Sequence, residues 1–342
     1  MVQSFVIGMD GGQTSTIAAV ADLGGNILGV GRGGPANHIK EPGGVERLRR
    51  TLESCRVQLG LGDFPGNIEP LEAGYFAMTG ASDAVGALVR EVFNAKRLVV
   101  EGDIWAACTG ASLDDPSIVV LAGTGTVARG LDKDGQELII GGWGYLGDEA
   151  GGYDIGRRAA IACCRARDGR GEKTILEELI LEATGTKSIR DFLWRIYSGA
   201  IARHELSRLS NLVARAAREG DLVAQELLIE AGEDLAAYAL AVQRKLGIES
   251  FQNGAVLPIF YTGGVFKAGP WLVDSFVRAI RHEFPKAEIS PAIFPPVIGA
   301  VIRALRLAGV AITSDVIEAL RQSASIINIE KIQEGMTKSE QS

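Results

Sequence analysis

The most restrictive feature of this sequence is a pattern that occurs twice. An apolar strand is followed by a glycine- and threonine-rich loop, a second strand, an aspartate–glycine turn and a third strand. The first copy begins at Phe5 and the second at Ser117. Chance can supply two glycine-rich hairpins, but a matching order of five elements favours an internal duplication. We therefore expect two related α/β halves, each beginning with antiparallel hairpins.

The loops at residues 10–16 and 123–126 have the composition of phosphate-binding loops. Glycine lets the backbone approach a ligand closely, and N–H groups and threonine hydroxyls supply donors without bulk. Two such loops in one chain predict a nucleotide held between the two halves. Ordinary β-branched strand residues are the alternative for the threonines, above all for Thr16. The candidates are Gly11, Gly12, Gln13, Thr14 and Thr16 in the first loop and Thr124, Gly125 and Thr126 in the second.

Two aspartates follow predicted strands and are candidates for the chemistry. Asp10 ends a strand beside the first loop, where its carboxylate would repel phosphate unless a cation lies between them. It therefore predicts a Mg²⁺ site, unless it only forms the turn before Gly11-Gly12. Asp103 lies at the end of another predicted strand, between the two loops in the sequence. There it could accept the proton of a substrate hydroxyl that attacks a γ-phosphate, or merely cap a helix.

A third cluster, residues 141–152, contains six glycines around Trp143 and two carboxylates. A tryptophan ring with carboxylates is typical of a sugar site, because the ring packs on C–H faces and the carboxylates accept hydroxyl hydrogens. The alternative is a flexible glycine loop that Trp143 anchors. Asn37 could add an amide to the same ligand or could be a turn residue. Gly144 and Asp148 complete the candidates in this cluster.

The segment 263–267 follows another predicted strand and precedes a helix. Gly263 and Gly264 would allow a base or a ribose to lie on the backbone, and Lys267 follows closely. The pattern is weak alone and gains weight as a third nucleotide loop.

Length and composition bound the remaining possibilities. A chain of 342 residues exceeds the size of one hydrophobic core. A net charge of −7 argues against nucleic-acid or anionic-membrane partners. The four cysteines lack metal-binding spacing and are expected to be reduced, packed thiols. No signal peptide or membrane span is visible, which favours the cytoplasm.

We expect an N-terminal domain at residues 1–116 and a C-terminal domain at 117–309 that carries a helical insertion at about 173–246. The last helix, about 297–309, could pack back onto the N-terminal domain, and residues 310–342 form a C-terminal extension.

Five segments of the chain together resemble a known family: residues 5–16, Asp103 with its neighbours, 121–126, 141–152 and 261–267. They resemble the N-acetylglucosamine kinase branch of the BadF/BadG/BcrA/BcrD ATPase family, within the actin-like, Hsp70-like sugar kinase superfamily. The resemblance spans about residues 5–307. It implies two ribonuclease H-like (actin-like ATPase) domains around a nucleotide cleft, with ATP and Mg²⁺ as cofactors.

The resemblance also implies a role for each candidate. Asp10 would face the metal, both threonine loops the phosphates, and Gly263 and Gly264 the adenosine. Asp103 would be the base that activates the 6-hydroxyl of the sugar. The sugar site would be lined by Asn37, Asp103, Trp143, Gly144 and Asp148.

The substrate and some alternatives stay open at this point. Val127 and Ile39 stand where animal N-acetylglucosamine kinases have asparagine and tryptophan, so N-acetylglucosamine, glucosamine and glucose all remain candidates. A BadF/BcrA-type ATPase that activates a partner enzyme, with an iron–sulfur cluster, is a rival, as is a binding protein without turnover. A homodimer through the helical region 173–246 is expected.

Overall fold

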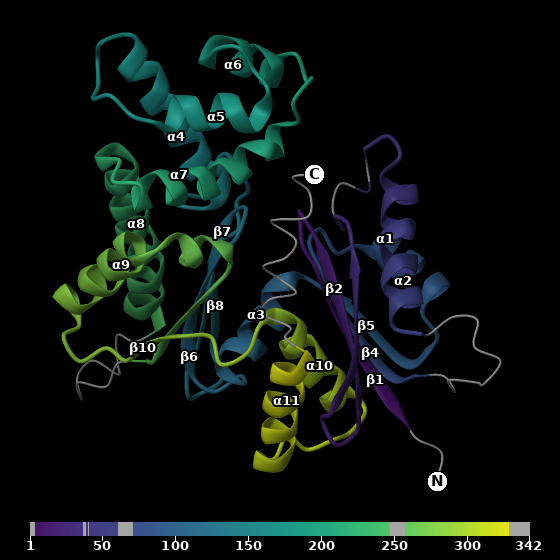
Figure 1. Ribbon diagram of the computed structural model, residues 1–342. Helices are drawn as coiled ribbons and strands as arrows, with labels where there is room; N and C mark the ends of the chain where they lie inside the picture. Colours follow the sequence, from purple (N-terminus) through teal and green to yellow (C-terminus); the bar gives the residue numbers. More distant parts are fainter. Residues whose placement is uncertain (1–3, 37–38, 40, 61–70, 247–256, 328–342) are drawn as a thin grey trace. The chain divides into compact units, whose positions relative to one another are not determined.

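The computed structural model describes residues 4–36, 39, 41–60, 71–246 and 257–327. It divides into two compact units, Met1–Asp114 with Ala292–Ser342 and Asp115–Pro291 (Figure 1). The first unit contains β1 (Phe5–Gly11), β2 (Thr16–Asp22), β3 (Ile27–Gly33), α1 (Gly44–Gln58), β4 (Leu71–Met78), α2 (Asp83–Val92), β5 (Ala95–Glu101), α3 (Asp103–Ser112), α10 (Pro296–Leu307) and α11 (Ser314–Ile327).

The second unit carries the remaining elements. They are β6 (Ser117–Ala122), β7 (Thr126–Leu131), β8 (Glu137–Gly141), α4 (Gly152–Arg167), α5 (Leu176–Thr184), α6 (Ile189–Tyr197), η1 (Arg203–Arg208), α7 (Leu209–Arg218), α8 (Leu222–Leu246), β9 (Ile259–Thr262), η3 (Gly264–Ala268), α9 (Pro270–Glu283) and β10 (Ile289–Pro291).

The two sheets share one topology. The first has the order β3-β2-β1-β4-β5, and the second, read from its β8 edge, has the order β8-β7-β6-β9-β10. In each sheet the first three strands pair antiparallel and the last two join in parallel. The repeated order of elements predicted from the sequence is therefore confirmed.

The second turn of each hairpin pair is built from the same hydrogen bonds. Asp22 Oδ1 accepts from the backbone N–H groups two and four residues later, both at 2.9 Å. Asp132 Oδ1 does the same at 2.9 and 2.8 Å. Three residues after each aspartate stands a glycine with positive φ, Gly25 at 91° and Gly135 at 81°. Such agreement in side-chain bonding and backbone conformation supports a duplication beyond the strand order alone.

The first sheet is covered on both faces, which explains the continuous apolar run in β1. Ile7 and Met9 pack with α1 and α2, whereas Val6 packs with α10. In Figure 1, α10 lies against β1 and β4, and α11 packs against β3, although both helices follow the whole second unit in the sequence. Glycine permits this contact, because a Cβ atom on Gly8 would lie 2.2 Å from the backbone nitrogen of Val301.

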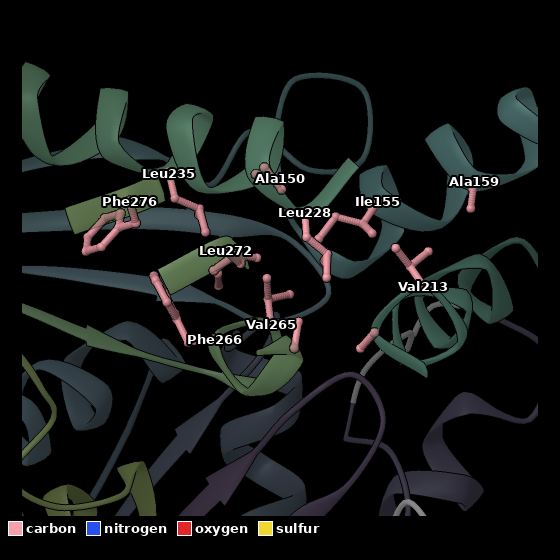
Figure 2. Packing of buried hydrophobic residues seen from close by; sticks show 14 of the residues in the cluster. Ala150, Ile155, Ala159, Val213, Leu228, Leu235, Val265, Phe266, Leu272 and Phe276 are labelled. Atoms are coloured by element: carbon pink, nitrogen blue, oxygen red, sulfur yellow. The ribbon is translucent and has the colours of Figure 1, made fainter. Parts of the chain in front are cut away.

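The core of the second unit joins its sheet to the helices between β8 and β9 and to α9, which follows β9. Leu228 and Leu235 of α8 pack against Leu272 and Phe276 of α9, next to Phe266 of η3 (Figure 2). The expected helical stretch 173–246 is formed by α5 to α8 with η1 between them. Within the described residues, no helix has the length and apolar character needed to cross a membrane.

The crossing of α10 and α3 gives a test of the first unit's packing. A Cβ atom on Gly299 would lie 1.9 Å from the carbonyl oxygen of Ala106 and 2.5 Å from the nitrogen of Gly110. Since backbone atoms cannot rotate away, we expect Gly299→Ala to lower the free energy of unfolding by about 3 kcal/mol. Urea unfolding followed by circular dichroism measures this change.

The control is Gly29→Ala, where the nearest atom to the new methyl group is a Leu59 side-chain carbon at 3.7 Å. An equal, small loss in both variants would contradict the close packing of α10 on α3.

Candidate active site

The candidate chemistry of the first unit gathers at one edge of its sheet. β1, β4 and β5 run parallel, so their carboxyl ends meet at the same edge, where ligands of open α/β sheets bind. The register pairs Asp10 with Ala77 and Ala77 with Glu101. Asp103 begins α3, two residues after β5 ends. Two acidic residues that are 93 positions apart in the sequence (103 − 10) are thus brought to one edge.

The first glycine–threonine loop connects β1 to β2 at this edge. It is closed by a hydrogen bond from the Gly12 nitrogen to the Ser15 carbonyl oxygen at 2.9 Å. Thr14 is exposed and Gln13 is half-buried. Thr16 differs from expectation, because it is fully buried and its hydroxyl donates to the Gly34 carbonyl oxygen at 2.8 Å. This hydroxyl ties the loop to the end of β3 and is not presented to a ligand.

Asp10 lies in an electrostatically unfavourable place for a carboxylate. Burial, followed by the negative charge of Asp103, raises its pKa to about 7 from an ordinary value of 3.8. A cation between this carboxylate and a phosphate would relieve both effects. Mg²⁺ usually keeps several waters and takes only one or two protein carboxylates, so this donor set fits it. Within the described residues, no group of three or more His, Cys, Asp or Glu side chains could hold a metal ion.

Asp103 is the first residue of α3, and Gly102 is the N-cap. The alternative that Asp103 caps the helix is therefore wrong. Its Oδ2 accepts a hydrogen bond from the Thr79 hydroxyl at 2.6 Å. Sequence reasoning missed Thr79, because Met78-Thr79-Gly80 has no phosphate-loop composition. Only the register of β4 against β5, which a single sequence does not reveal, brings Thr79 opposite Asp103.

The second glycine–threonine loop connects β6 to β7 and is bound to the start of α4. Gly123 and Thr124 accept backbone hydrogen bonds from the first two residues of that helix, at 2.8 and 3.0 Å. Thr126 is only 2% exposed, and within the described part of the chain its hydroxyl oxygen has no hydrogen-bond partner. A buried hydroxyl without a partner is costly, and in native structures it calls for an explanation such as a ligand or a water.

The glycine cluster 141–152 folds back on itself through Asp148. Its Oδ1 accepts from the Trp143 nitrogen at 2.8 Å and its Oδ2 from the Gly144 nitrogen at 3.1 Å. A Cβ atom on Gly125 would lie 2.6 Å from Asp148 Oδ2, so this carboxylate adjoins the second phosphate loop. The Trp143 side chain is 81% exposed. Near the end of the cluster, Ala150 has a φ of 55°, a conformation that L residues rarely adopt and that often marks a functional segment.

The third glycine pair follows β9, the neighbour of β6. Gly263 has a φ of 108°, and a Cβ atom there would lie 2.2 Å from the carbonyl oxygen of Ala122, just before the second phosphate loop. Gly264 faces open space, with no atom within 4 Å of a Cβ placed on it among the described residues. Lys267 is exposed on η3. The second unit thus brings together residues 123–126, 141–152 and 263–264, whereas Asn37 lies outside the described residues.

All four cysteines are free thiols. Burial raises the pKa of the Cys55 thiol to about 12, and that of Cys163 to the same value. Cys163 is fully buried in the core of the second unit, and Cys164 is half-buried beside it on α4. These thiols behave as packed core groups and are poor candidates for cluster ligands.

The raised pKa of Asp10 predicts a pH-dependent stability change in Asp10→Asn. Between pH 4 and 7 the unfolded chain loses this proton while most of the folded chain keeps it, so rising pH destabilises the wild type. Above about pH 8 both states have lost the proton and the difference is constant. Asparagine cannot ionise. We expect Asp10→Asn to be more stable, with an advantage that grows by up to about 2 kcal/mol between pH 5.5 and 7, at about 1.4 kcal/mol per unit.

Urea unfolding in EDTA at pH 5.5, 7 and 8 measures this advantage. Asp315→Asn, an exposed aspartate in the first turn of α11, is the control. An Asp10→Asn advantage that is the same at pH 5.5 and 7 would contradict the raised pKa.

Comparison with known proteins agrees with this architecture. The chain is 32% identical over 304 residues to an N-acetylmuramic acid/N-acetylglucosamine kinase of Clostridium acetobutylicum, covering 87% of this chain and 97% of the relative. It is 25% identical over 247 residues to the glucosamine kinase GspK of Vibrio cholerae, covering 71% and 81%.

Solved structures confirm the predicted fold class. A candidate N-acetylglucosamine kinase from Chromobacterium violaceum matches with a TM-score of 0.67 and 28% identity, over 90% of this chain and 100% of that chain. A ROK family glucokinase from Streptomyces griseus, solved with glucose and AMPPNP, shares the fold with a TM-score of 0.56 and 19% identity, over 88% and 98%. The sequence model of the BadF/BadG/BcrA/BcrD ATPase family matches residues 7–304. The chain belongs to the BadF/BadG/BcrA/BcrD ATPase family.

Proposed function

We propose that this protein is an ATP-dependent kinase that phosphorylates the 6-hydroxyl of an amino sugar, N-acetylglucosamine or glucosamine. The observation that carries the proposal is the pair Asp10 and Asp103 at the carboxyl edge of the first sheet, beside a glycine–threonine loop. The relatives named as amino-sugar kinases support the substrate class.

Asp103 is assigned as the general base. It stands at the start of α3, where one carboxylate oxygen is held by Thr79 and the other is available to a substrate hydroxyl. Phosphoryl transfer needs little covalent help from the protein, so positioning the attacking oxygen and taking its proton are the main tasks. A positioned base of this kind contributes about 10²–10⁴-fold to the rate.

Asp10 is assigned to Mg²⁺, held directly or through water. When bound, the ion neutralises phosphate charge as the γ-phosphoryl group moves. The backbone of Gly11 and Gly12 and the exposed Thr14 hydroxyl would bind phosphate oxygens from the first unit. In the second unit, Thr124, Gly125 and the Thr126 hydroxyl, which has no partner among the described residues, would do the same. Gly263 and the open face of Gly264 would receive the adenosine, with Lys267 beyond them.

The sugar is assigned to the glycine cluster of the second unit, together with Asn37 and Asp103. The exposed ring of Trp143 offers an apolar face for sugar C–H groups. The Asp148 carboxylate uses two of its lone-pair sites to hold Trp143 and Gly144, and about two remain for sugar hydroxyls.

Two alternatives are separable by experiment. A hexokinase acting on glucose would use the same residues and differ only in the sugar that it turns over. An ATPase that activates a partner enzyme would release ADP without any sugar. A homodimer through the helices of residues 173–246 is also proposed; exposed Trp194 and Tyr197 on α6 support it, and light scattering on the full chain tests it.

The first experiment is ADP release from Mg-ATP with glucosamine, N-acetylglucosamine, glucose or no sugar. We expect ADP release that depends on an amino sugar and a fall of about 10²–10⁴-fold in kcat for Asp103→Asn, because the base is lost while its shape is kept. A 6-deoxy amino sugar should give no ADP, since the accepting hydroxyl is missing.

Asp315→Asn is the matched control, because it removes a first-turn aspartate of the same unit without touching the sheet edge. ADP release that is indifferent to every sugar would favour the activator ATPase. Full activity in Asp103→Asn would contradict the assignment of Asp103 as the base.

A further inference from the structure

Thr79 connects the candidate base to the first phosphate loop. Its hydroxyl donates to Asp103 Oδ2 at 2.6 Å, and its backbone nitrogen donates to the Gly11 carbonyl oxygen at 2.8 Å. One residue is thus bonded both to the carboxylate and to the turn that follows Asp10. Hydrogen bonds from a hydroxyl to a carboxylate are among the stronger hydrogen bonds in proteins.

The position of Thr79 follows from the strand register. β4 and β5 pair in parallel with Ala77 opposite Glu101. Continuing that register by two residues places Thr79 opposite Asp103, one residue beyond the end of β4. The contact is therefore set by the sheet itself and does not depend on a flexible side chain reaching across a loop.

The Glu101 side chain, two residues before Asp103, is held from β4 and from α10. The Tyr75 hydroxyl donates to Glu101, and the Arg303 guanidinium lies 4.9 Å from the Tyr75 ring centroid and 3.8 Å from Glu101. Burial, followed by the hydrogen bond to Glu101, raises the pKa of the Tyr75 hydroxyl, which keeps it protonated and able to donate. Because the Asp103 backbone belongs to α3, the main freedom left to this residue is rotation of its side chain.

Thr79 removes that freedom. In the described part of the chain, Asp103 Oδ1 accepts no hydrogen bond, whereas Oδ2 is occupied by Thr79. We propose that Thr79 is a positioning residue that orients the Asp103 carboxylate so that Oδ1 faces the attacking sugar hydroxyl, an inference that rests on the kinase function proposed above. The oxygen of the sugar hydroxyl forms a bond to the γ-phosphorus of ATP while the bond between that phosphorus and ADP breaks. The proton of the hydroxyl passes to Asp103 Oδ1.

The test begins with the isosteric pair Thr79→Val and Thr79→Ser. Valine keeps the shape and removes the hydroxyl, so we expect kcat to fall by about 10- to 100-fold, as for misplaced reacting groups. The KM values for ATP and for the sugar should change little. Serine restores the hydroxyl and should restore most of kcat.

A double-mutant cycle separates positioning from a general structural effect. If Thr79 acts through Asp103, Thr79→Val should cost almost nothing further in the Asp103→Asn background, because the base is already lost. Independent losses that multiply in the double variant would overturn the proposal.

Thr184→Val is the matched control, since Thr184 on α5 of the second unit also donates a hydrogen bond, to the Ile180 carbonyl oxygen at 2.6 Å. Its kcat should stay near that of the wild type, and thermal melts should confirm that all variants are folded. A kcat for Thr79→Val equal to that of the wild type, or a loss confined to the sugar KM, would overturn the positioning role. If the wild type itself releases no ADP with any sugar, the proposed function fails instead, so the two failures are distinct.

Discussion

The candidate site depends on an electrostatic conflict between two carboxylates. Asp10 and Asp103 stand at one edge of a parallel sheet, where burial and mutual repulsion raise the pKa of Asp10 to about 7. A sheet built for stability alone would not keep this pair. The fold tolerates the conflict because the register of β1, β4 and β5 fixes both positions, and a bound cation would turn the repulsion into affinity. The fold therefore gives up some stability at the place where the proposed chemistry needs both carboxylates. Such a loss is common at active sites.

Much of the fold could be predicted from the sequence. The strands before each glycine–threonine loop, the helices within residues 173–246 and the helix at residues 296–307 lie close to their expected positions. Buried apolar runs and glycine turns are local signals, and duplication reinforced them.

The site was predictable in its residue types and less so in its contacts. The acidic and glycine-rich positions have recognisable compositions, but Thr79 depends on pairing between strands that are far apart in the sequence. The burial of Thr16 also depends on pairing, since its hydroxyl bonds to Gly34 after β3. A single sequence carries no direct signal for either contact, whereas the strand register determines both.

The two copies of the hairpin motif differ in how they use one threonine hydroxyl. Thr16 and Thr126 occupy the same place, opposite the last residue of the preceding strand. The first hydroxyl is used inside the protein, and the second is buried without a partner in the described chain. In the first copy the Thr16 hydroxyl therefore stabilises the protein itself. In the second copy the Thr126 hydroxyl stays available to a ligand.

The return of α10 to the first sheet has a consequence for synthesis of the chain. Val6 and Tyr75 belong to a core that residues 296–307 complete, yet the ribosome makes residues 115–291 in between. The second unit can therefore close its core during translation, while one face of the first sheet waits without its cover. The unit that is synthesised first is the last to be finished, and until then its bare face is a natural target for chaperones.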